Sequence, residues 1–238
     1  MSIAANTNDM ANDMAESDAT FGAGGSEPYA TALRRNESAV LHLHDDLEGT
    51  VSASSTMDVA KWNADADAAD LTLLRSVTGP VLDIGCGPGR MVRAARSLGI
   101  EALGIDVSPT AVSIAIDAGL AVIQGSIFDP MPSEGQWQTA LLVDGNIGIG
   151  GDVSAMLQRC TELLSPTGEI VVELHADPEH DRTYRGMLVG TDGTASASFP
   201  WAEIGLERLL ERAAALGLVS RQSWLVAGRS FVRLAPAA

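Results

Sequence analysis

The spacing of apolar residues changes in a regular way along this chain of 238 residues. From residue 81 onward, short apolar runs that suit buried strands alternate with segments whose apolar residues recur every three or four positions, as on one face of a helix. Strands are expected at 81–84, 101–105, 121–124, 139–143 and 169–174. Helices are expected between them, at about 89–98, 109–118 and 153–164. This alternation predicts a mostly parallel sheet with helices on both faces.

The end of the chain follows a different pattern. Residues 175–200 are polar and lose their periodicity, and a final helix is expected at about 202–216. Two alternating runs at 221–226 and 230–234 flank Ala227-Gly228, which predicts a β-hairpin. We therefore expect an α/β fold with a Rossmann-like, doubly wound, seven-stranded sheet that is mostly parallel and has an antiparallel C-terminal hairpin strand.

The N-terminal part is less regular. Residues 1–27 are rich in polar and small residues with Phe21 as their only aromatic, so we expect a disordered acidic tail. Residues 28–56 carry a loose helical pattern, either a lid over the site or a plain surface helix. The main domain is expected at 57–238 and begins with one helix or two short ones. In it, Trp62 is either a core residue or a wall of a pocket.

Composition excludes several classes of function. The net charge of −16 argues against nucleic acid as a partner. The only cysteines, Cys86 and Cys160, do not suggest a disulfide framework, and the chain shows no zinc-binding spacing. His42 and His44 alternate with leucines but lack a third ligand, so no metal is expected. With no signal sequence and no long apolar span, we expect a cytoplasmic protein without membrane contact.

The stretch Val81-Leu82-Asp83-Ile84-Gly85-Cys86-Gly87-Pro88-Gly89-Arg90 leads a buried strand into a glycine-rich turn. Glycines let a ligand approach the backbone closely, and the following helix offers N–H groups to an anion. A dinucleotide-binding turn would need glycine where Arg90 stands, and a phosphate-binding Walker loop would need a lysine that is absent. The pattern present is D-x-G-x-G-x-G.

This pattern resembles motif I of the class I S-adenosylmethionine-dependent methyltransferases, and the resemblance extends over roughly 57–234, including the terminal hairpin. It implies a methyltransferase whose cofactor is S-adenosyl-L-methionine. The glycine turn would hold the cofactor's carboxylate, Asp83 its ammonium, and Asp106 both ribose hydroxyls. The residues expected to bind the cofactor are Asp83, Gly85, Cys86, Gly87, Gly89, Asp106, Val107, Ser126, Ile127, Phe128, Asp129, Asp144 and Gly145.

The adenine site departs from the family pattern. Related enzymes usually have an acid after the third strand, and Ser126 stands in its place here. A serine hydroxyl accepts the adenine hydrogen bond more weakly than a carboxylate. Asp129 either substitutes for that acid or only begins the turn before Pro130.

The catalytic residues are expected after the next two strands. The loop 144–152 should border the transferred methyl group, with Asp144 positioning the acceptor or the cofactor ammonium. His175, directly after a strand, is the candidate general base, or only a loop residue. Trp201 is either an apolar wall of the acceptor pocket or a core residue.

These expectations lead to one main function and two alternatives. The main one is methyl transfer to an oxygen or nitrogen of a small-molecule acceptor by a monomer or homodimer. The first alternative is a methyltransferase-like regulatory protein that binds the cofactor without turnover. The second is an NAD(P)-dependent oxidoreductase, which Arg90 and the terminal hairpin oppose.

Overall fold

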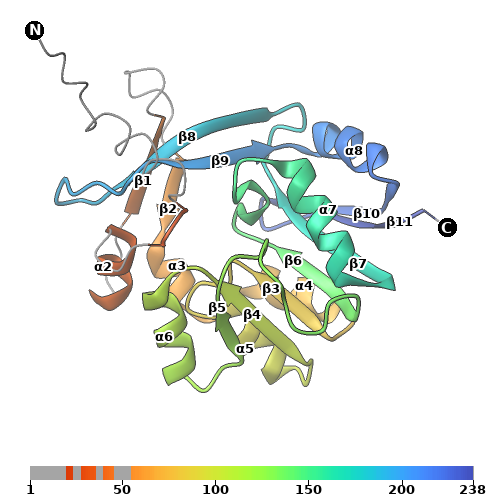
Figure 1. Cartoon of the computed structure of the whole chain (residues 1–238), viewed down its shortest axis with the longest axis horizontal. Coiled ribbons are helices and arrows are strands. Elements are labelled where there is room, and N and C mark those ends of the chain that lie inside the picture. The colour runs from red at the N-terminus through yellow and green to blue at the C-terminus, as the bar shows by residue number, and fades with distance from the viewer. Residues whose placement is uncertain (1–19, 24–27, 36–39, 46–54, 238) are drawn as a thin grey trace, which may run out of the picture.

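A seven-stranded sheet organises the computed structural model, which describes residues 20–23, 28–35, 40–45 and 55–237 (Figure 1). The strands lie in the order β10-β11-β7-β6-β3-β4-β5. Their bounds are β3 Val81–Ile84, β4 Ala102–Asp106, β5 Val122–Gln124, β6 Trp137–Leu142, β7 Leu164–Leu174, β10 Leu218–Val226 and β11 Arg229–Pro236. Strands β3 to β7 pair in parallel, whereas β11 pairs antiparallel with β7 and β10. The expected fold class is therefore confirmed.

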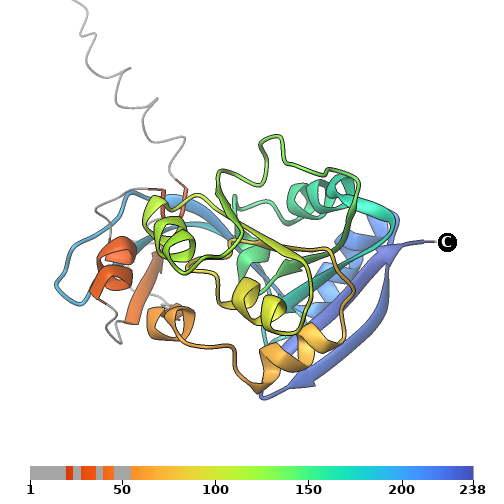
Figure 2. The same ribbon diagram turned by 90° about the horizontal axis from the view of Figure 1, so that it is seen from below.

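Helices cover both faces of this sheet, as Figures 1 and 2 show. Their bounds are α4 Ala68–Arg75, α5 Arg90–Ser97, α6 Pro109–Asp117, α7 Val153–Leu163 and α8 Leu206–Ala215. The side chains of α4 and α5 share a buried cluster with alternate residues of β3, β6 and β7, and α7 and α8 pack on the residues between them. This arrangement follows from the strand period of two, which turns successive side chains to opposite faces.

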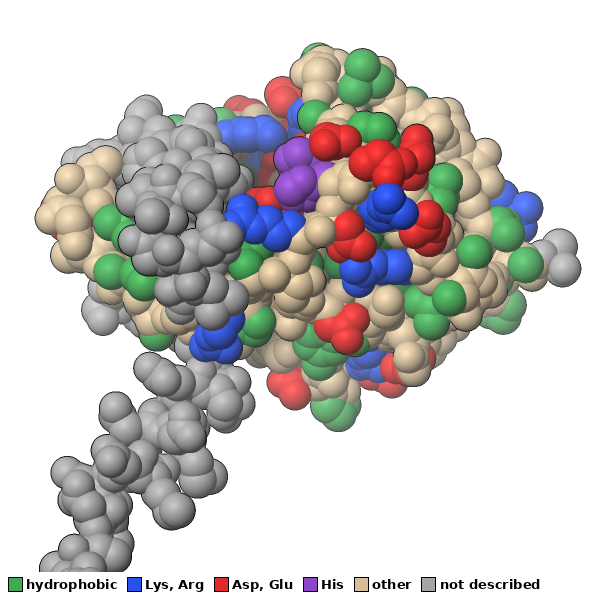
Figure 3. Space-filling view, turned by 90° about the horizontal axis from the view of Figure 1, so that it is seen from above, with side chains coloured by type: hydrophobic (Ala, Val, Ile, Leu, Met, Phe, Trp, Pro, Cys, Tyr) green, Lys and Arg blue, Asp and Glu red, His purple; other side chains and the backbone are tan. Residues whose placement is uncertain are grey.

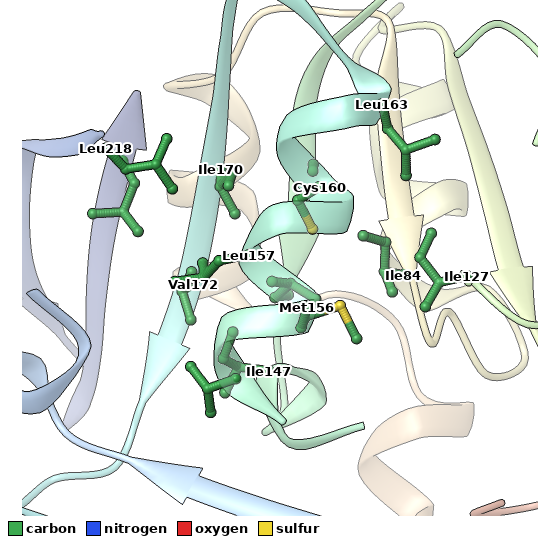
Figure 4. Close-up of a cluster of buried hydrophobic side chains, with 14 of the residues drawn as sticks. Ile84, Ile127, Ile147, Met156, Leu157, Cys160, Leu163, Ile170, Val172 and Leu218 are labelled. Atoms are coloured by element: carbon green, nitrogen blue, oxygen red, sulfur yellow. The ribbon is translucent and has the colours of Figure 1, made fainter. Parts of the chain in front are cut away.

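The core between α7 and the sheet shows how the sequence sets the packing (Figure 4). The carboxylate of Asp152 accepts a hydrogen bond from the Ala155 amide and starts α7, where the sequence predicts a helix over 153–164. Met156, Leu157 and Cys160 are then fully buried against the sheet. Because their spacing fits one helical face, the helix docks in a single orientation.

A second sheet of four antiparallel strands, in the order β2-β1-β8-β9, runs across the upper part of Figure 1. Its strands are β1 Val40–Asp45, β2 Ser55–Asp58, β8 Asp181–Val189 and β9 Phe199–Ile204. The sequence analysis is wrong here in two ways. Residues 40–45 form a strand and not a helix, because leucine and histidine alternate with period two. Residues 175–200 are not irregular throughout, and the last helix begins only at Leu206, after β9.

The alternation in β8 is easy to overlook in the sequence. Tyr184, Gly186 and Leu188 face the core while the residues between them are more exposed. A glycine at the middle buried position interrupts the apolar signal that identifies a strand. The close packing of β9 depends on another glycine, because a Cβ at Gly148 would lie 2.0 Å from the carbonyl oxygen of Ala202.

The N-terminal segments lie beside the glycine turn. Of the segment 28–56 that the sequence predicts as helical, only the first part forms a helix, α2 (Pro28–Arg35). The predicted helical region before the first strand of the large sheet forms two short helices, α3 (Val59–Asn63) and α4. Residues 20–23 form a turn packed against Tyr29, so the prediction of disorder is wrong for them. The rest of the predicted tail lies outside the described residues. In the part of the chain that the structure describes, no helix is long and apolar enough to cross a membrane.

Candidate active site

A cavity lies where β3, β4 and β6 end and the four-stranded sheet begins. The cavity is partly open to solvent and is lined by residues of both sheets and of the N-terminal segments. Strand β3 is the switch point of the large sheet, since the chain adds β4 on one side of it and β6 on the other. Ligands of open α/β sheets bind at the carboxyl ends of strands beside such a point.

The glycine turn forms one wall of this cavity. Gly87 has a φ of 54°, in the left-handed region that favours glycine, and its missing side chain leaves room for the Tyr29 hydroxyl, which would lie 3.3 Å from a Cβ there. Helix α5 starts immediately after the turn. Gly85, Cys86 and Gly87 line the cavity, but their amides donate to the Ile105 carbonyl oxygen and to Asp106. The structure therefore does not present these amides to a cofactor carboxylate, as the sequence analysis expected.

Asp106, at the end of β4, reaches back to the glycine turn. Its Oδ2 accepts a hydrogen bond from the Gly87 amide and its Oδ1 accepts one from the Ser108 amide, both at 2.8 Å. Burial raises the pKa of this carboxyl, while the two backbone hydrogen bonds act in the opposite direction. Each carboxylate oxygen can accept more than one hydrogen bond, so both retain capacity toward the cavity.

Asp83 is the unusual group of the site. Its side chain lines the cavity, is 2% exposed, and has no hydrogen-bond partner for either oxygen among the described residues. Burial, followed by the charges of Asp144 and Asp106, raises the pKa of Asp83 to about 8. A buried carboxylate without a partner is costly, so this position calls for a donor from a bound ligand.

Asp144, directly after β6, is held in an ion cluster. The Arg90 guanidinium pairs with it, and the Lys61 ammonium lies 2.8 Å from its Oδ1. Burial would raise the pKa of Asp144, but the charges of Arg90 and Lys61 outweigh it and lower the pKa. The carboxylate therefore stays ionised and paired.

The same ion cluster extends to residues of α4, β7 and β11. Arg90 also pairs with the fully buried Asp70, and Arg229 of the terminal hairpin lies 2.7 Å from Asp70 and 2.7 Å from Glu173. The backbone amide of Asp144 donates to Glu173 at 2.7 Å. Three acids are thus matched by the charges of Arg90, Arg229 and Lys61. The arginine that excludes a dinucleotide turn has a structural role that the sequence analysis did not identify.

The loop after β5 forms the far end of the cavity. Ser126, Ile127 and Phe128 line it, as expected, and the Phe128 amide donates to the Ser126 hydroxyl at 3.2 Å. Asp129 does not line the cavity. Its Oδ2 accepts from the Ser126 amide at 3.4 Å, so it shapes the loop and does not face the ligand space.

Another wall of the cavity, which adjoins the glycine turn through Tyr29, is aromatic. Phe21, Tyr29, Trp62 and Trp201 line it, and the Phe21 ring lies 5.1 Å from the Tyr29 ring and 5.6 Å from the Trp201 ring, centroid to centroid. Both tryptophans thus take the pocket-wall position that the sequence left open, and Trp201 is buried as well. Phe21 and Tyr29 escaped the sequence analysis, although a single aromatic in a polar segment was an available signal.

His175 follows β7 as expected but does not line the cavity. Its side chain is exposed, its Nδ1 accepts from the Asp177 amide at 3.2 Å, and its ring stacks on His180 with centroids 3.8 Å apart. Figure 3 shows histidine side chains gathered on the outer surface. The structure therefore does not bring the expected base to the cavity.

Most of the expected cofactor residues do meet there. Those that line the cavity are Asp83, Gly85, Cys86, Gly87, Asp106, Val107, Ser126, Ile127, Phe128 and Asp144. Gly89 and Gly145 lie just outside it and start the helical segments α5 and η1 (Asn146–Gly148). Asn146, which the sequence analysis did not single out, lines the cavity and donates from its Nδ2 to the carbonyl oxygens of Ile84 and Gly85 at 2.8 and 3.0 Å.

Comparison with known proteins agrees with this geometry. Residues 81–168 match a family model described as a methyltransferase domain. No curated protein matches the sequence. A solved S-adenosylmethionine-dependent methyltransferase from Bacteroides fragilis, in complex with S-adenosyl-L-homocysteine, is 21% identical with a TM-score of 0.71, over 89% of this chain and 93% of that chain.

Two further solved structures share the fold at lower identity. The 1,6-didemethyltoxoflavin-N1-methyltransferase of Burkholderia thailandensis is 16% identical, with a TM-score of 0.55 over 74% of this chain and 81% of that chain. The glycopeptide N-methyltransferase MtfA, complexed with S-adenosyl-L-methionine, is 14% identical, with a TM-score of 0.57 over 73% of this chain and 95% of that chain.

The chain has the fold of these solved methyltransferases, with a mostly parallel seven-stranded sheet and a closing antiparallel hairpin. Within it, residues 81–168 match the family model of the methyltransferase domain. The resemblance identified from the sequence is therefore confirmed.

Proposed function

We propose that the protein transfers a methyl group from S-adenosyl-L-methionine to an oxygen or nitrogen of a small-molecule acceptor. The observation that carries this proposal is the unpartnered, buried Asp83 beside Asp106, both facing one cavity at the glycine turn. Of the groups that the donor molecule carries, the cavity offers a partner for the ammonium, the ribose diol and the adenine.

The residues divide this task along the cavity. Asp83 would accept hydrogen bonds from the ammonium, and its ionised form would then be stabilised. Asp106 would accept from the ribose hydroxyls with its remaining lone pairs. Ile127 and Phe128 would cover the adenine, with Ser126 accepting from the adenine amino group. When bound, the donor supplies an electrophilic methyl group.

The chain's own contribution to the reaction is mainly alignment. Methyl transfer is an in-line displacement, so holding the acceptor behind the methyl group accounts for much of the rate. Asn146 fixes the loop after β6 to the end of β3 and so sets the shape of the wall beside both molecules. The aromatic wall would keep water out of this space. Asp144 would position ligands through the cluster that holds it, without acting as a base.

The type of acceptor is the finer part of the proposal. Two structural neighbours are named as N-methyltransferases, one for a glycopeptide and one for a didemethyltoxoflavin. The net charge of −16 disfavours nucleic acid as the acceptor. These observations support a small molecule.

Titration calorimetry with S-adenosyl-L-methionine and S-adenosyl-L-homocysteine tests the proposal. Both should bind, and Asp106→Ala should weaken binding by about tenfold or more, because it removes the ribose acceptor. Asp117→Asn, an exposed acid at the end of α6, is the matched control and should leave affinity unchanged.

Two outcomes would contradict the proposal. If neither molecule binds and a nicotinamide cofactor does, the oxidoreductase alternative replaces it. If S-adenosyl-L-methionine binds but no methylated product forms with any acceptor fraction of a cell extract, the protein is the regulatory alternative.

A further inference from the structure

Tyr29, on helix α2, has a buried hydroxyl at the edge of the cavity. The residue is 2% exposed and lines the cavity beside the glycine turn. Its hydroxyl oxygen would lie 3.3 Å from a Cβ at Gly87, so it stands directly next to that residue. Among the residues that the structure describes, this hydroxyl has no hydrogen-bond partner. A buried hydroxyl without a partner is unfavourable, so this group, like Asp83, calls for a ligand.

Several contacts hold the Tyr29 ring in place. Helices α2 and α6 lie side by side (Figures 1 and 2), and Arg34 ties them by donating from its Nη2 to the Thr110 hydroxyl at 2.9 Å. Gly22 lies against the ring, since a Cβ there would be 3.1 Å from the Tyr29 Cδ1. The Phe21 ring packs on another side with centroids 5.1 Å apart. The position of the hydroxyl is therefore set by packing before a ligand binds.

The Tyr29 hydroxyl and Asp106 meet at the same glycine. The Asp106 Oδ2 accepts from the Gly87 amide at 2.8 Å, and the hydroxyl lies next to Gly87 as well. Burial, followed by the charge of Asp106, raises the pKa of Tyr29 well above its usual value, so the phenol keeps its proton and can donate. A hydrogen-bond donor and an acceptor thus stand beside one residue of the turn.

This pair of groups favours a neutral hydroxyl as its ligand. A hydroxyl both donates and accepts, so it can satisfy Asp106 and Tyr29 together. An ammonium could donate to Asp106 but has no lone pair for the phenol proton. The charge of Asp106 reaches the Tyr29 oxygen, so it would also repel a carboxylate or phosphate bound there.

We propose that Tyr29 is a second ribose-binding residue, whose hydroxyl donates to one ribose hydroxyl oxygen of the methyl donor while Asp106 accepts from the diol. The proposal rests on the proposed methyl transfer, which makes S-adenosyl-L-methionine the ligand. It adds a residue that lies outside the segment 81–168 matched by the methyltransferase domain model. Helix α2 then completes the donor site from the N-terminal part of the chain and orients the ribose.

Calorimetry on the full-length protein tests this assignment, with S-adenosyl-L-homocysteine and its 2′-deoxy and 3′-deoxy derivatives as ligands. Tyr29→Phe removes only the hydroxyl and should weaken binding of S-adenosyl-L-homocysteine about threefold to tenfold, the range expected for one hydrogen bond. For the derivative that lacks the contacted hydroxyl, the same substitution should leave the affinity unchanged. Weakly bound derivatives are measured by displacement of S-adenosyl-L-homocysteine.

Tyr184→Phe is the matched control. Tyr184 is the only other tyrosine of the chain, is 6% exposed, and donates to the Glu203 Oε1 at 3.1 Å outside the cavity. Its substitution should leave the affinity for all three ligands unchanged but lower the thermal midpoint of the free protein, because it breaks a hydrogen bond. Tyr29→Phe should keep the midpoint of the free protein and reduce only the increase that S-adenosyl-L-homocysteine produces.

The outcomes separate this assignment from the proposed function. Unchanged affinity of Tyr29→Phe for S-adenosyl-L-homocysteine, or a loss that persists with both deoxy derivatives, would overturn the ribose contact and leave methyl transfer intact. A midpoint of free Tyr29→Phe as low as that of Tyr184→Phe would overturn it too, since the hydroxyl would then have a partner within the protein. Failure of the parent protein to bind S-adenosyl-L-homocysteine would overturn both proposals.

Discussion

The two sheets of this molecule are built in different ways. In the parallel region β3, β4 and β5 are joined by single helices, and the longest pairing, β3 with β6, joins Val81 to Thr139, 58 positions later. In the four-stranded sheet, β1 pairs with β8, and His42 faces Val189, 147 positions later. Local sequence thus specifies the sheet that carries the glycine turn, whereas the second sheet depends on long-range pairing.

The two sides of the cavity also differ in whether their residues lie close together or far apart in the sequence. The expected cofactor residues from Asp83 to Asp144 lie in one continuous stretch, which includes the glycine turn. The aromatic wall combines Phe21 and Trp201, which lie near opposite ends of the chain. The side with the expected cofactor residues is therefore a local unit, and the aromatic wall is assembled from distant segments.

The largest expected effect is a loss of stability on the side of the cavity that carries the expected cofactor residues. Arg90→Met removes a 4%-exposed guanidinium and leaves Asp70, fully buried, with one fewer partner. Breaking a buried ion pair from one side should reduce the free energy of unfolding by about 3–5 kcal/mol, measured by urea titration. Arg93→Met, one turn along α5, removes a surface pair at 3.4 Å whose acid is 92% exposed, and should cost under about 1 kcal/mol. Similar losses for both would contradict the structural role of Arg90.

The next effect depends on pH. The pKa of Asp83 is about 8 in the folded protein and about 3.9 when unfolded, so the folded chain keeps a proton that the unfolded chain has lost between these values. This contribution to stability is present at low pH and decreases as pH rises toward about 8. Asp83→Asn should abolish it, so the variant should gain stability over the parent protein by up to about 1.4 kcal/mol per pH unit.

Urea titrations at several pH values between about 5 and 8 would measure this difference. Asp117→Asn, an exposed acid, provides the control and should follow the parent protein at every pH. Parallel curves for Asp83→Asn and the parent protein would show that Asp83 is ionised in the folded chain.

The smallest expected effect concerns the aromatic wall. Phe21→Ala removes a partly exposed ring, so the free energy of unfolding should fall by only about 1 kcal/mol. The affinity for S-adenosyl-L-homocysteine, measured by calorimetry, should stay unchanged. A loss of this affinity as large as that expected of Asp106→Ala would show that the two sides of the cavity are not separate.

The same difference explains what the sequence could predict. The strand Val81–Ile84 lies where it was predicted, and Ser108 and Asp152 cap the helices expected at 109–118 and 153–164. These signals could be read from the sequence because each spans only a few residues. The strand at 40–45 and the placement of Phe21 depend on partners far along the chain. A local pattern contains no information about such partners.

The same distinction between local signals and long-range packing applies to the residues of the candidate site. Asp106 could be placed from motif spacing alone, and it lies at the glycine turn. His175 could be placed only at the end of its strand, and the exposed direction of its side chain follows from the packing of β9 and the loop before β8. The ion cluster around Arg90 could not be foreseen, because Arg229 joins it from the far end of the sequence.

The long-range pairing of β1 with β8 also has a consequence for the order in which the molecule forms during synthesis. Strands β3 to β7 all leave the ribosome before β8 does, so the nucleoside half can begin to fold while β1 still lacks its partner. The aromatic wall is completed only when β9, which carries Trp201, has emerged. A nascent chain would therefore form its glycine turn before the aromatic wall of the same cavity.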